Sequence, residues 1–227
     1  MNEAMSDPAV QARMKKTARL AGILYAVLAL AMFPEIIRNT LIVAGDAAKT
    51  AANIMSNELL FRAGIFGDLV FQTSFVFLGL TLYRLFRNTH KNVGRTMVAL
   101  ILVSVPVAML NALNPLAALA LFGQNDNDQG MFFIGMFKNG VLIAEIFWGL
   151  WLFPLGWLSY KSGFIPKLLG ILLMAGCFGY LTDSFLGLVF PLYRSLSAPL
   201  ITVAAIAELA MVFYLLVFGI RIKRSPQ

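Results

Sequence analysis

The stretch ITVAAIAELAMVFYLLVFGI, residues 201–220, contains twenty residues and a single charged side chain, Glu208. A helix of about 20 residues, at about 1.5 Å of rise per residue, spans the roughly 30 Å hydrocarbon core of a bilayer. The stretch therefore predicts a membrane-spanning helix. It also raises the question of why so apolar a segment contains a carboxylate near its middle.

The composition of the whole chain extends the membrane assignment beyond this one stretch. Of the 227 residues, 59% are hydrophobic and 13% are charged, and the mean hydropathy is +0.80. Soluble domains have roughly a quarter of their residues charged. Six apolar runs are long enough to cross a bilayer, approximately at residues 17–42, 58–86, 93–121, 131–160, 165–189 and 198–221. The sequence predicts an all-α, polytopic membrane protein with six transmembrane helices.

The connections between these runs are short, and none is long or polar enough to form a separate soluble domain. We expect a cytoplasmic N-terminal segment at residues 1–16, one six-helix membrane domain at 17–221 and a cytoplasmic tail at 222–227. The basic start and the following LALA, residues 28–31, also fit a cleavable signal peptide. The apolar run continues past this point, which favours a retained first helix.

Basic residues are distributed unevenly between the two ends of the predicted helices. One side has thirteen of them: Arg13, Lys15, Lys16, Arg19, Arg84, Arg87, Lys91, Arg95, Lys161, Lys167, Arg221, Lys223 and Arg224. The other side has five: Arg38, Lys49, Arg62, Lys138 and Arg194. By the positive-inside rule, this bias predicts that both termini are in the cytoplasm, with the chain in the plasma membrane. The net charge of +7 is then explained by contact with anionic lipid headgroups, and nucleic acid is not an expected partner.

Acidic side chains recur at matching depths along the predicted helices. In the first and fifth helices an acid follows a basic residue by sixteen positions, and in the third an asparagine does so. In the three returning helices an acid precedes a basic residue by sixteen positions. The six residues are Glu35, Asp68, Asn111, Glu145, Asp183 and Glu208. Sixteen residues of helix correspond to roughly 24 Å, so all six are predicted in the outer half of the bundle.

This spacing is what three repeated helical hairpins would produce. Internal duplication is one explanation. The other is geometry, because helices that cross one bilayer with basic cytoplasmic ends show similar spacings without any duplication. Both explanations remain open at the level of the sequence.

Carboxylates at this depth cost about 2.5–3.5 kcal/mol each on insertion scales, so they are expected to face the bundle interior and to have partners. Glu35 and Arg38 are one helical turn apart, and Lys138 and Glu145 are two turns apart on one face. We expect a polar layer in which Asp183 and Glu208 line one cavity. The candidate ligand-binding residues are Glu35, Asp68, Asn111, Lys138, Glu145, Asp183 and Glu208.

Clustered membrane carboxylates suit a site for a cation or small polar ligand, as in a transporter or ligand-binding membrane protein. Two alternatives remain open. The carboxylates can join helices in a structural or regulatory membrane subunit. They can also serve as acid and base in an intramembrane enzyme.

Most known catalytic and cofactor patterns are absent from the sequence. His90 is the only histidine and lies in a predicted cytoplasmic loop, away from the polar layer, which argues against a histidine dyad or haem ligation there. Cys177 is the only cysteine. No cofactor is expected and the sequence does not point to an enzyme. A magnesium or calcium site made of carboxylates alone stays open.

Several stretches together resemble a known family. They are ARLAGILY at residues 18–25, GDAAKTAANI at 45–54, LFRAGIFGDL at 60–69, SGFIPKLLGILLMAGCFGYLTDSF at 162–185 and AELAMVFYLLVFGI at 207–220. Over about residues 16–221 the chain is similar to the bacterial membrane family catalogued as domain of unknown function 4386. The resemblance implies a multi-pass bacterial membrane protein, and it implies no activity and no catalytic residue.

Reporter fusions test the predicted orientation. A reporter fused after Gln227 should be active in the cytoplasm, and one inserted near Gln124 should report the opposite side, because thirteen of the basic residues lie on the predicted inner side. Fusions that report the same side at both positions would contradict the six-helix topology.

Overall fold

The computed structural model describes residues 7–220. Within this range the chain forms α-helices, one short 3₁₀ helix and loops, without a β-strand. The elements are α1 (Pro8–Ala31), α2 (Phe33–Asn39), α3 (Ala47–Ser56), α4 (Glu58–Phe86), α5 (Lys91–Asn111), α6 (Leu113–Gly123), α7 (Asn127–Ser162), α8 (Lys167–Val189), η2 (Pro191–Ser197) and α9 (Ala198–Val217).

Six stretches of the described chain are long and apolar enough to cross a membrane, which confirms the predicted all-α, multi-pass fold. They are Pro8–Asn39, Glu58–Phe86, Lys91–Gly123, Asn127–Ser162, Lys167–Val189 and Pro191–Val217. The first begins earlier than predicted, because α1 continues through residues 8–16 from a cap in which the Asp7 carboxylate accepts the Ala9 N–H. The predicted tail at 222–227 and the first six residues lie outside the described residues.

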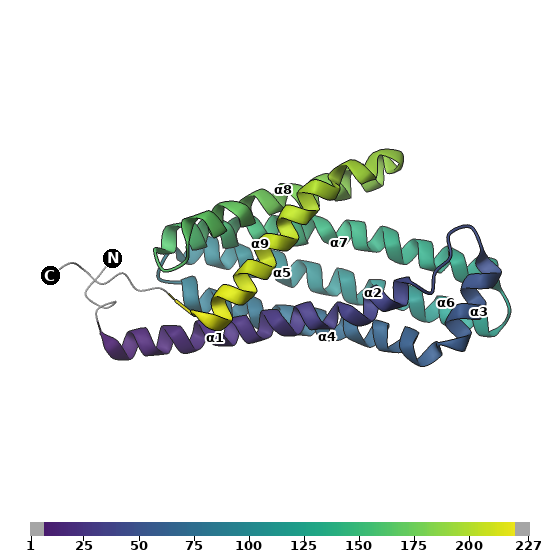
Figure 1. Cartoon of the computed structure of the whole chain (residues 1–227), viewed down its shortest axis with the longest axis horizontal. Coiled ribbons are helices and arrows are strands. Elements are labelled where there is room, and N and C mark those ends of the chain that lie inside the picture. The colour runs from purple at the N-terminus through teal and green to yellow at the C-terminus, as the bar shows by residue number, and fades with distance from the viewer. Residues whose placement is uncertain (1–6, 221–227) are drawn as a thin grey trace.

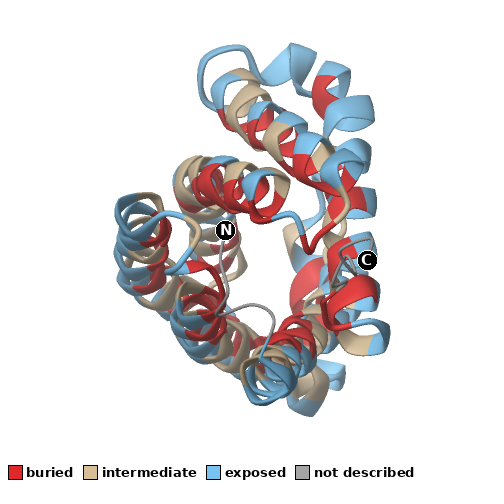
Figure 2. Cartoon of the chain, turned by 90° about the vertical axis from the view of Figure 1, so that its left-hand side faces the viewer, coloured by how far each residue is buried: buried red, intermediate tan, exposed pale blue. Residues whose placement is uncertain are grey.

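The long helices run side by side along one axis of the molecule (Figure 1). The start of α1 and the end of α9 lie at the same end of the bundle, as an even number of crossings requires, and α3 lies at the opposite end. We refer to the end with α3 as the outer end, following the predicted orientation. Viewed along the bundle, buried positions face neighbouring helices and exposed positions cover the outside (Figure 2).

Much of this outer covering is apolar. Leu59, Phe66 and Leu192 are 83%, 67% and 92% exposed, respectively. Large exposed apolar areas are unusual on monomeric proteins in water, whereas a bilayer solvates them. The distribution of apolar side chains therefore agrees with a membrane location.

Two of the spans are broken in their outer halves. Met32 separates α1 from α2, and Ala112 separates α5 from α6. Pro34 lies in the first turn of α2, where its missing N–H leaves no helical hydrogen bond unmade. Each break lies within three residues of a polar residue noted from the sequence, Glu35 or Asn111. The fifth span, α8, is continuous, so the proposed repeat of three hairpins stays a prediction.

The polar layer lies between two apolar clusters. The larger cluster joins α1, α4, α5, α7, α8 and α9, and the smaller one joins α3, α4, α6 and α7 near the outer end. Along α4, Asp68 and Gln72 come after Ile65 of the smaller cluster and before Phe75 of the larger one. The bundle is thus divided into an apolar inner part, a polar layer and an apolar outer cap.

Helices α7 and α8 touch through their backbones, which fixes the two halves of the polar layer against each other. A Cβ added at Gly156 of α7 would lie 2.5 Å from the carbonyl oxygen of Gly170 in α8, and one added at Gly170 would lie 2.7 Å from the carbonyl oxygen of Gly156. Only glycine permits so close an approach. This contact sets the distance between helices that carry Glu145 and Asp183.

Replacing Gly156 with alanine should therefore destabilise the protein by about 1–3 kcal/mol, because the added methyl group overpacks a backbone contact. Unfolding in detergent with increasing denaturant measures the change. Gly135→Ala is the matched control on the same helix: a Cβ there has no atom within 4 Å. That variant should be neutral or more stable by about 0.5–1 kcal/mol. Equal stability of the two variants would contradict the close approach.

Candidate functional site

A buried arginine joins three elements near the outer end. Arg38 of α2 is 2% exposed, and its Nη1 donates a hydrogen bond of 2.8 Å to Asp68 Oδ2 of α4. Its Nη2 lies 3.9 Å from Glu35 Oε1, and its guanidinium lies 4.8 Å from the ring centroid of Phe137 in α7. The sequence pointed to Glu35 as the partner of Arg38, and the structure adds Asp68 as a closer partner from another helix. We call Glu35, Arg38 and Asp68 the arginine cluster.

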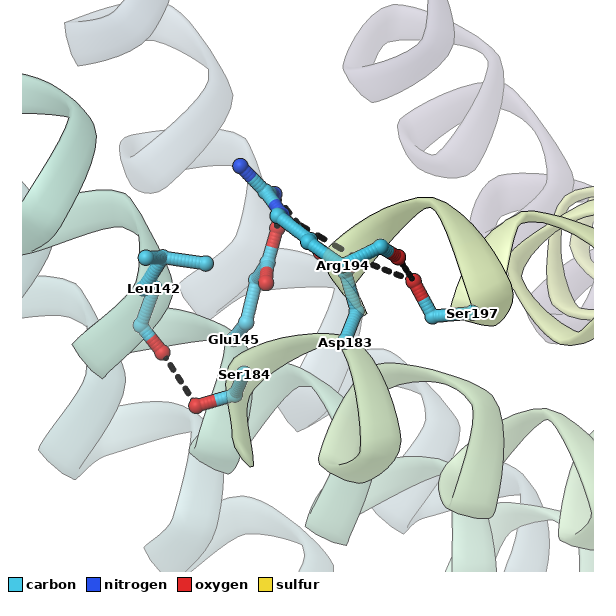
Figure 3. Close-up of polar contacts among 6 residues, drawn as sticks. All are labelled: Leu142, Glu145, Asp183, Ser184, Arg194 and Ser197. Atoms are coloured by element: carbon cyan, nitrogen blue, oxygen red, sulfur yellow. Dashed lines mark hydrogen bonds and ion pairs between the residues drawn. The ribbon is translucent and has the colours of Figure 1, made fainter. Parts of the chain in front are cut away.

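A second ionic group lies where the chain turns from α8 into α9. Helix α8 ends at Val189, and η2 then brings Arg194 back to Asp183, eleven positions earlier in the chain. The Arg194 Nη2 donates to Asp183 Oδ2 at 2.6 Å and lies 3.8 Å from Glu145 Oε1 of α7 (Figure 3). Ser197 donates a hydrogen bond to Asp183 Oδ1. We call these four residues the cavity cluster.

Ser184 supports this arrangement from the next position along α8. Its hydroxyl donates to the carbonyl oxygen of Leu142 in α7 at 2.7 Å (Figure 3). The bond holds the outer part of α8 against α7 at Leu142, which is one turn before Glu145 on α7. The partner of Asp183 comes from η2, eleven positions later in the chain, a separation that helical spacing does not reveal.

The cavity cluster lines an open cavity of about 420 Å³ between α7, α8 and the η2–α9 connection. Glu145, Tyr180, Asp183, Arg194 and Ser197 contribute to its wall. Arg194 is 44% exposed here, so its guanidinium is accessible as well as paired. Glu145 is 9% exposed, and its Oε2 has no hydrogen-bond partner among the described residues.

Glu208 forms the third polar group, deeper in the bundle. The Tyr25 hydroxyl of α1 donates to Glu208 Oε2 at 2.7 Å, and the Tyr180 hydroxyl of α8 donates to Oε1 at 2.9 Å. We expected Glu208 to line one cavity with Asp183. It does not line this cavity, and it is connected to the cavity wall through Tyr180. We call Tyr25, Tyr180 and Glu208 the tyrosine cluster. Sequence reasoning missed both tyrosines, because tyrosine is common on apolar helices and carries no charge signal.

The last two predicted residues differ in their surroundings. Asn111 donates through Nδ2 to the carbonyl oxygen of Phe137 at 2.8 Å and accepts from Asn114 at 2.8 Å, so it joins α5 to α7 beside the arginine cluster. Lys138 is exposed and makes no hydrogen bond or ion pair within residues 7–220, including with Glu145. The structure therefore places Asn111 in the polar layer and Lys138 outside it.

Several buried polar atoms of the layer make no hydrogen bond within the part of the chain that is described. They are Arg38 Nη2, Gln72 Oε1, Glu145 Oε2 and Trp148 Nε1. Almost all buried polar atoms in folded proteins make a hydrogen bond to protein or to ordered water. These atoms offer both donors and acceptors. The outer half of the bundle therefore has unused capacity to bind water or a polar ligand.

The charge of the layer is unbalanced. With Glu35, Asp68, Glu145, Asp183 and Glu208 all ionised, five negative charges face the two guanidinium groups of Arg38 and Arg194, so the layer has a net charge of −3. Glu35 also lies close enough to Glu145 for their charges to interact, so the arginine and cavity clusters are electrostatically connected. No group of three or more His, Cys, Asp or Glu side chains within the described range is arranged to hold a metal ion.

The helices and their carboxylate-rich layer define an α-helical, multi-pass membrane protein with a polar region inside the outer half. Residues 20–219 match the family described as Domain of unknown function (DUF4386), and the chain belongs to this family, as the resemblance predicted. An uncharacterised protein of Archaeoglobus fulgidus is 48% identical over 44 residues, which are 19% of this chain and 27% of that protein. The chain thus spans about a quarter of the length of this relative. No solved structure matches the chain.

The arginine cluster is expected to be a main source of stability in the outer half. Arg38→Leu alone or Asp68→Leu alone should each destabilise the protein by about 3–5 kcal/mol, because each leaves the other charge buried without its partner. The double variant should regain much of this loss. Unfolding of the four proteins in detergent gives the double-mutant cycle.

The exposed pair Arg62 and Glu58 on α4 is the matched control, since both side chains are about half exposed and bond at 2.7 Å. Its single variants to glutamine should change stability by less than about 1 kcal/mol. A double variant of the arginine cluster that is no more stable than the weaker single variant would contradict the assignment.

Proposed function

We propose that this protein binds a small organic cation, such as a protonated amine, in the cavity between α7, α8 and η2, and transports it across the membrane. The observation that carries the proposal is Glu145 Oε2, a buried carboxylate oxygen without a partner, on a residue that lines an open cavity. An ammonium group supplies the missing charge and the missing hydrogen bond together.

The neighbours of Glu145 support a cationic ligand over an anionic one. Asp183 and Arg194 pair closely with each other, and Ser197 also binds Asp183. Arg194 is 3.8 Å from Glu145, so it compensates that carboxylate less completely. The aromatic ring of Tyr180 in the wall suits a cation, because ring faces attract positive charge. The cavity of about 420 Å³ falls within the range typical of small-molecule sites.

The arrangement of helices around the cavity supports transport. Membrane transporters commonly bind substrate between groups of helices that can move against one another. Here the cavity lies between α7, α8 and the η2–α9 connection. Helix α9 packs on α1 and α8, and its outer half leans away from α2 together with the end of α8 (Figure 1). This pair of helices is the natural moving part.

The predicted orientation sets the direction of access. With both termini in the cytoplasm of a bacterial cell, the cavity lies toward the external side of the plasma membrane. The basic residues at the opposite ends of the helices would then contact anionic lipid headgroups. The cavity is thus positioned to receive its ligand from outside the cell.

The interpretation of the carboxylates as structural contacts applies to one part of the layer. Arg38 is almost fully buried, binds Asp68 directly and lies against the Phe137 ring. These contacts join α2, α4 and α7, as polar side chains between membrane helices commonly do. The arginine cluster therefore supports the fold, and the cavity cluster binds the ligand.

Binding to purified protein in lipid nanodiscs tests the proposal. The probes are a panel of primary, secondary and quaternary ammonium compounds, with sodium and potassium for comparison, measured by calorimetry. At least one ammonium compound should bind, and Glu145→Gln should weaken its binding tenfold or more, which corresponds to about 1.4 kcal/mol.

Asp128→Asn is the matched control, because Asp128 is an exposed acid on the same helix, at its outer end. It should bind the same compound as the unmodified protein does. Uptake of that compound into proteoliposomes then separates a transporter from a protein that only binds. Failure of every ammonium compound to bind, or equal binding by Glu145→Gln, would overturn the proposal.

A further inference from the structure

The tyrosine cluster contains a carboxylate whose two oxygens are both engaged by neutral donors. Tyr25 donates to Oε2 and Tyr180 donates to Oε1 of Glu208, at 2.7 and 2.9 Å. The ionised form of a carboxylate accepts hydrogen bonds only, so two tyrosine donors satisfy this form. Glu208 has no ion pair with a basic side chain within residues 7–220. In its ionised form, Glu208 is therefore stabilised inside the membrane by hydrogen bonds alone.

Protonation would change the same contact. A protonated carboxyl group has a hydroxyl of its own, which needs an acceptor. One tyrosine hydroxyl then has to rotate and accept this proton, or to give up its bond to Glu208. Because Tyr25 belongs to α1 and Tyr180 to α8, the change alters how α9 is held against one of these helices. Proton binding and the position of α9 are therefore linked by geometry.

Tyr180 also connects this carboxylate to the cavity. It contributes to the cavity wall and donates to Glu208. Its hydroxyl is close enough to Glu145 for the two groups to interact electrostatically. A proton can enter in two balanced transfers: the Tyr180 hydroxyl gives its proton to Glu208, and a hydronium ion in the cavity gives one to the Tyr180 oxygen and becomes water. The reverse transfers return the proton to water.

We propose that Glu208 is a proton-binding site connected through Tyr180 to the cavity, and that the proton is the coupling ion of this protein. Proton binding at Glu208 stands independently of the ligand. The coupling rests on the function proposed above, because the proton drives transport only if the cavity binds a substrate. A carboxylate near the middle of α9 then has a role that pure helix packing does not require.

The other ionisable groups on the helices around α9 are accounted for separately. On α1 the charged residues are Arg13, Lys15, Lys16 and Arg19, which lie toward the end with the termini. On α8 and η2, Asp183 and Arg194 pair with each other, Lys167 lies in the first turn of α8, and Cys177 and Tyr193 are the other titratable side chains apart from Tyr180. Glu145 of α7 lines the same cavity as Tyr180 and interacts electrostatically with it. Tyr25 and Tyr180 are the only groups that bond to Glu208 within the described part of the chain.

The structure also supplies an optical reporter. The ring of Trp151 lies 6.0 Å from that of Tyr25, so a change in the Tyr25 contact should alter its fluorescence. Trp157 lies 5.3 Å from the ring of His90, outside the tyrosine cluster, and Trp148 is one turn from Glu145 on α7. A Trp148→Phe, Trp157→Phe background therefore leaves Trp151 as the single reporter.

The experiment is a pH titration of this background protein in nanodiscs, without added ligand, from about pH 4 to about pH 9, a range that includes exposed and buried carboxyl groups. Infrared difference spectra should show a C=O band of a protonated carboxyl group whose midpoint coincides with that of a change in Trp151 fluorescence. Glu208→Gln should remove this one band, leaving those of the other carboxyl groups, and should remove the fluorescence change. Asp128→Asn, the exposed control on α7, should leave both in place.

Two further variants retain the carboxylate and test its connections. Tyr25→Phe should shift the C=O band, because the carboxyl group loses one hydrogen bond. Glu145→Gln should move the midpoint of the Glu208 transition, because it removes a charge that acts on Tyr180. These variants keep the proposal testable if Glu208→Gln does not fold.

The possible outcomes separate the two proposals. Persistence of both signals in Glu208→Gln, absence of a protonated carboxyl band over the whole range, or an unchanged band in Tyr25→Phe would overturn the proton site. An unchanged midpoint in Glu145→Gln would overturn its connection to the cavity. Loss of amine binding with an intact Glu208 transition would instead overturn the proposed function and leave the proton site in place.

Discussion

A carboxylate placed in the hydrocarbon of a bilayer has to find a positive charge or hydrogen-bond donors, because lipid supplies neither. This requirement organises the outer half of the protein. Asp68 is satisfied by a buried arginine, Asp183 by an arginine and a serine, and Glu208 by two tyrosines. Each solution joins different helices, so the positions of α2, α4, α8 and α9 depend on where the carboxylates are.

The arginine, cavity and tyrosine clusters also differ in which polar groups can still bind a ligand or a proton. The arginine cluster is closed, since Arg38 is buried and packed against an aromatic ring. The cavity cluster is open, since Arg194 is partly exposed and one oxygen of Glu145 is unused. The tyrosine cluster is neutral around its carboxylate, so a single proton can change it. A structural cluster, a proposed binding site and a proposed proton site thus lie next to one another in this part of the bundle.

Much of the fold was predictable from local patterns. The ends of the apolar runs agree with the observed spans to within a few residues at most positions. The exceptions are the start of α1, where a cap at Asp7 extends the helix into a charged segment, and the start of the last span, which includes η2 and begins at Pro191. Amphipathic and charged residues at helix ends are ambiguous in sequence, because the same side chains suit a helix or a solvated loop. The identity of the polar layer was also predictable, since acids in apolar runs stand out by composition alone.

The pairings of side chains within the polar layer could not be predicted from the sequence. Lys138 was grouped with Glu145 because seven positions on a helix return to the same face, yet its side chain is exposed and makes no ion pair in the described structure. Arg194 looked like a loop residue at the outer surface, and the turn through η2 returns it to Asp183. Tyr25 and Glu208 are 183 positions apart, and no pattern within a single helix relates them.

The sequence by itself determined that the chain has six helices able to cross a membrane and which of its carboxylates lie within them. These properties follow from the length, hydropathy and charge of individual segments, which do not depend on the neighbouring helices. Only the tertiary structure decided which carboxylate is paired, which one lines a cavity and which one depends on tyrosines. Those outcomes depend on helix rotation and on contacts such as that between Gly156 and Gly170, where backbone shape rather than residue polarity sets how closely two helices meet.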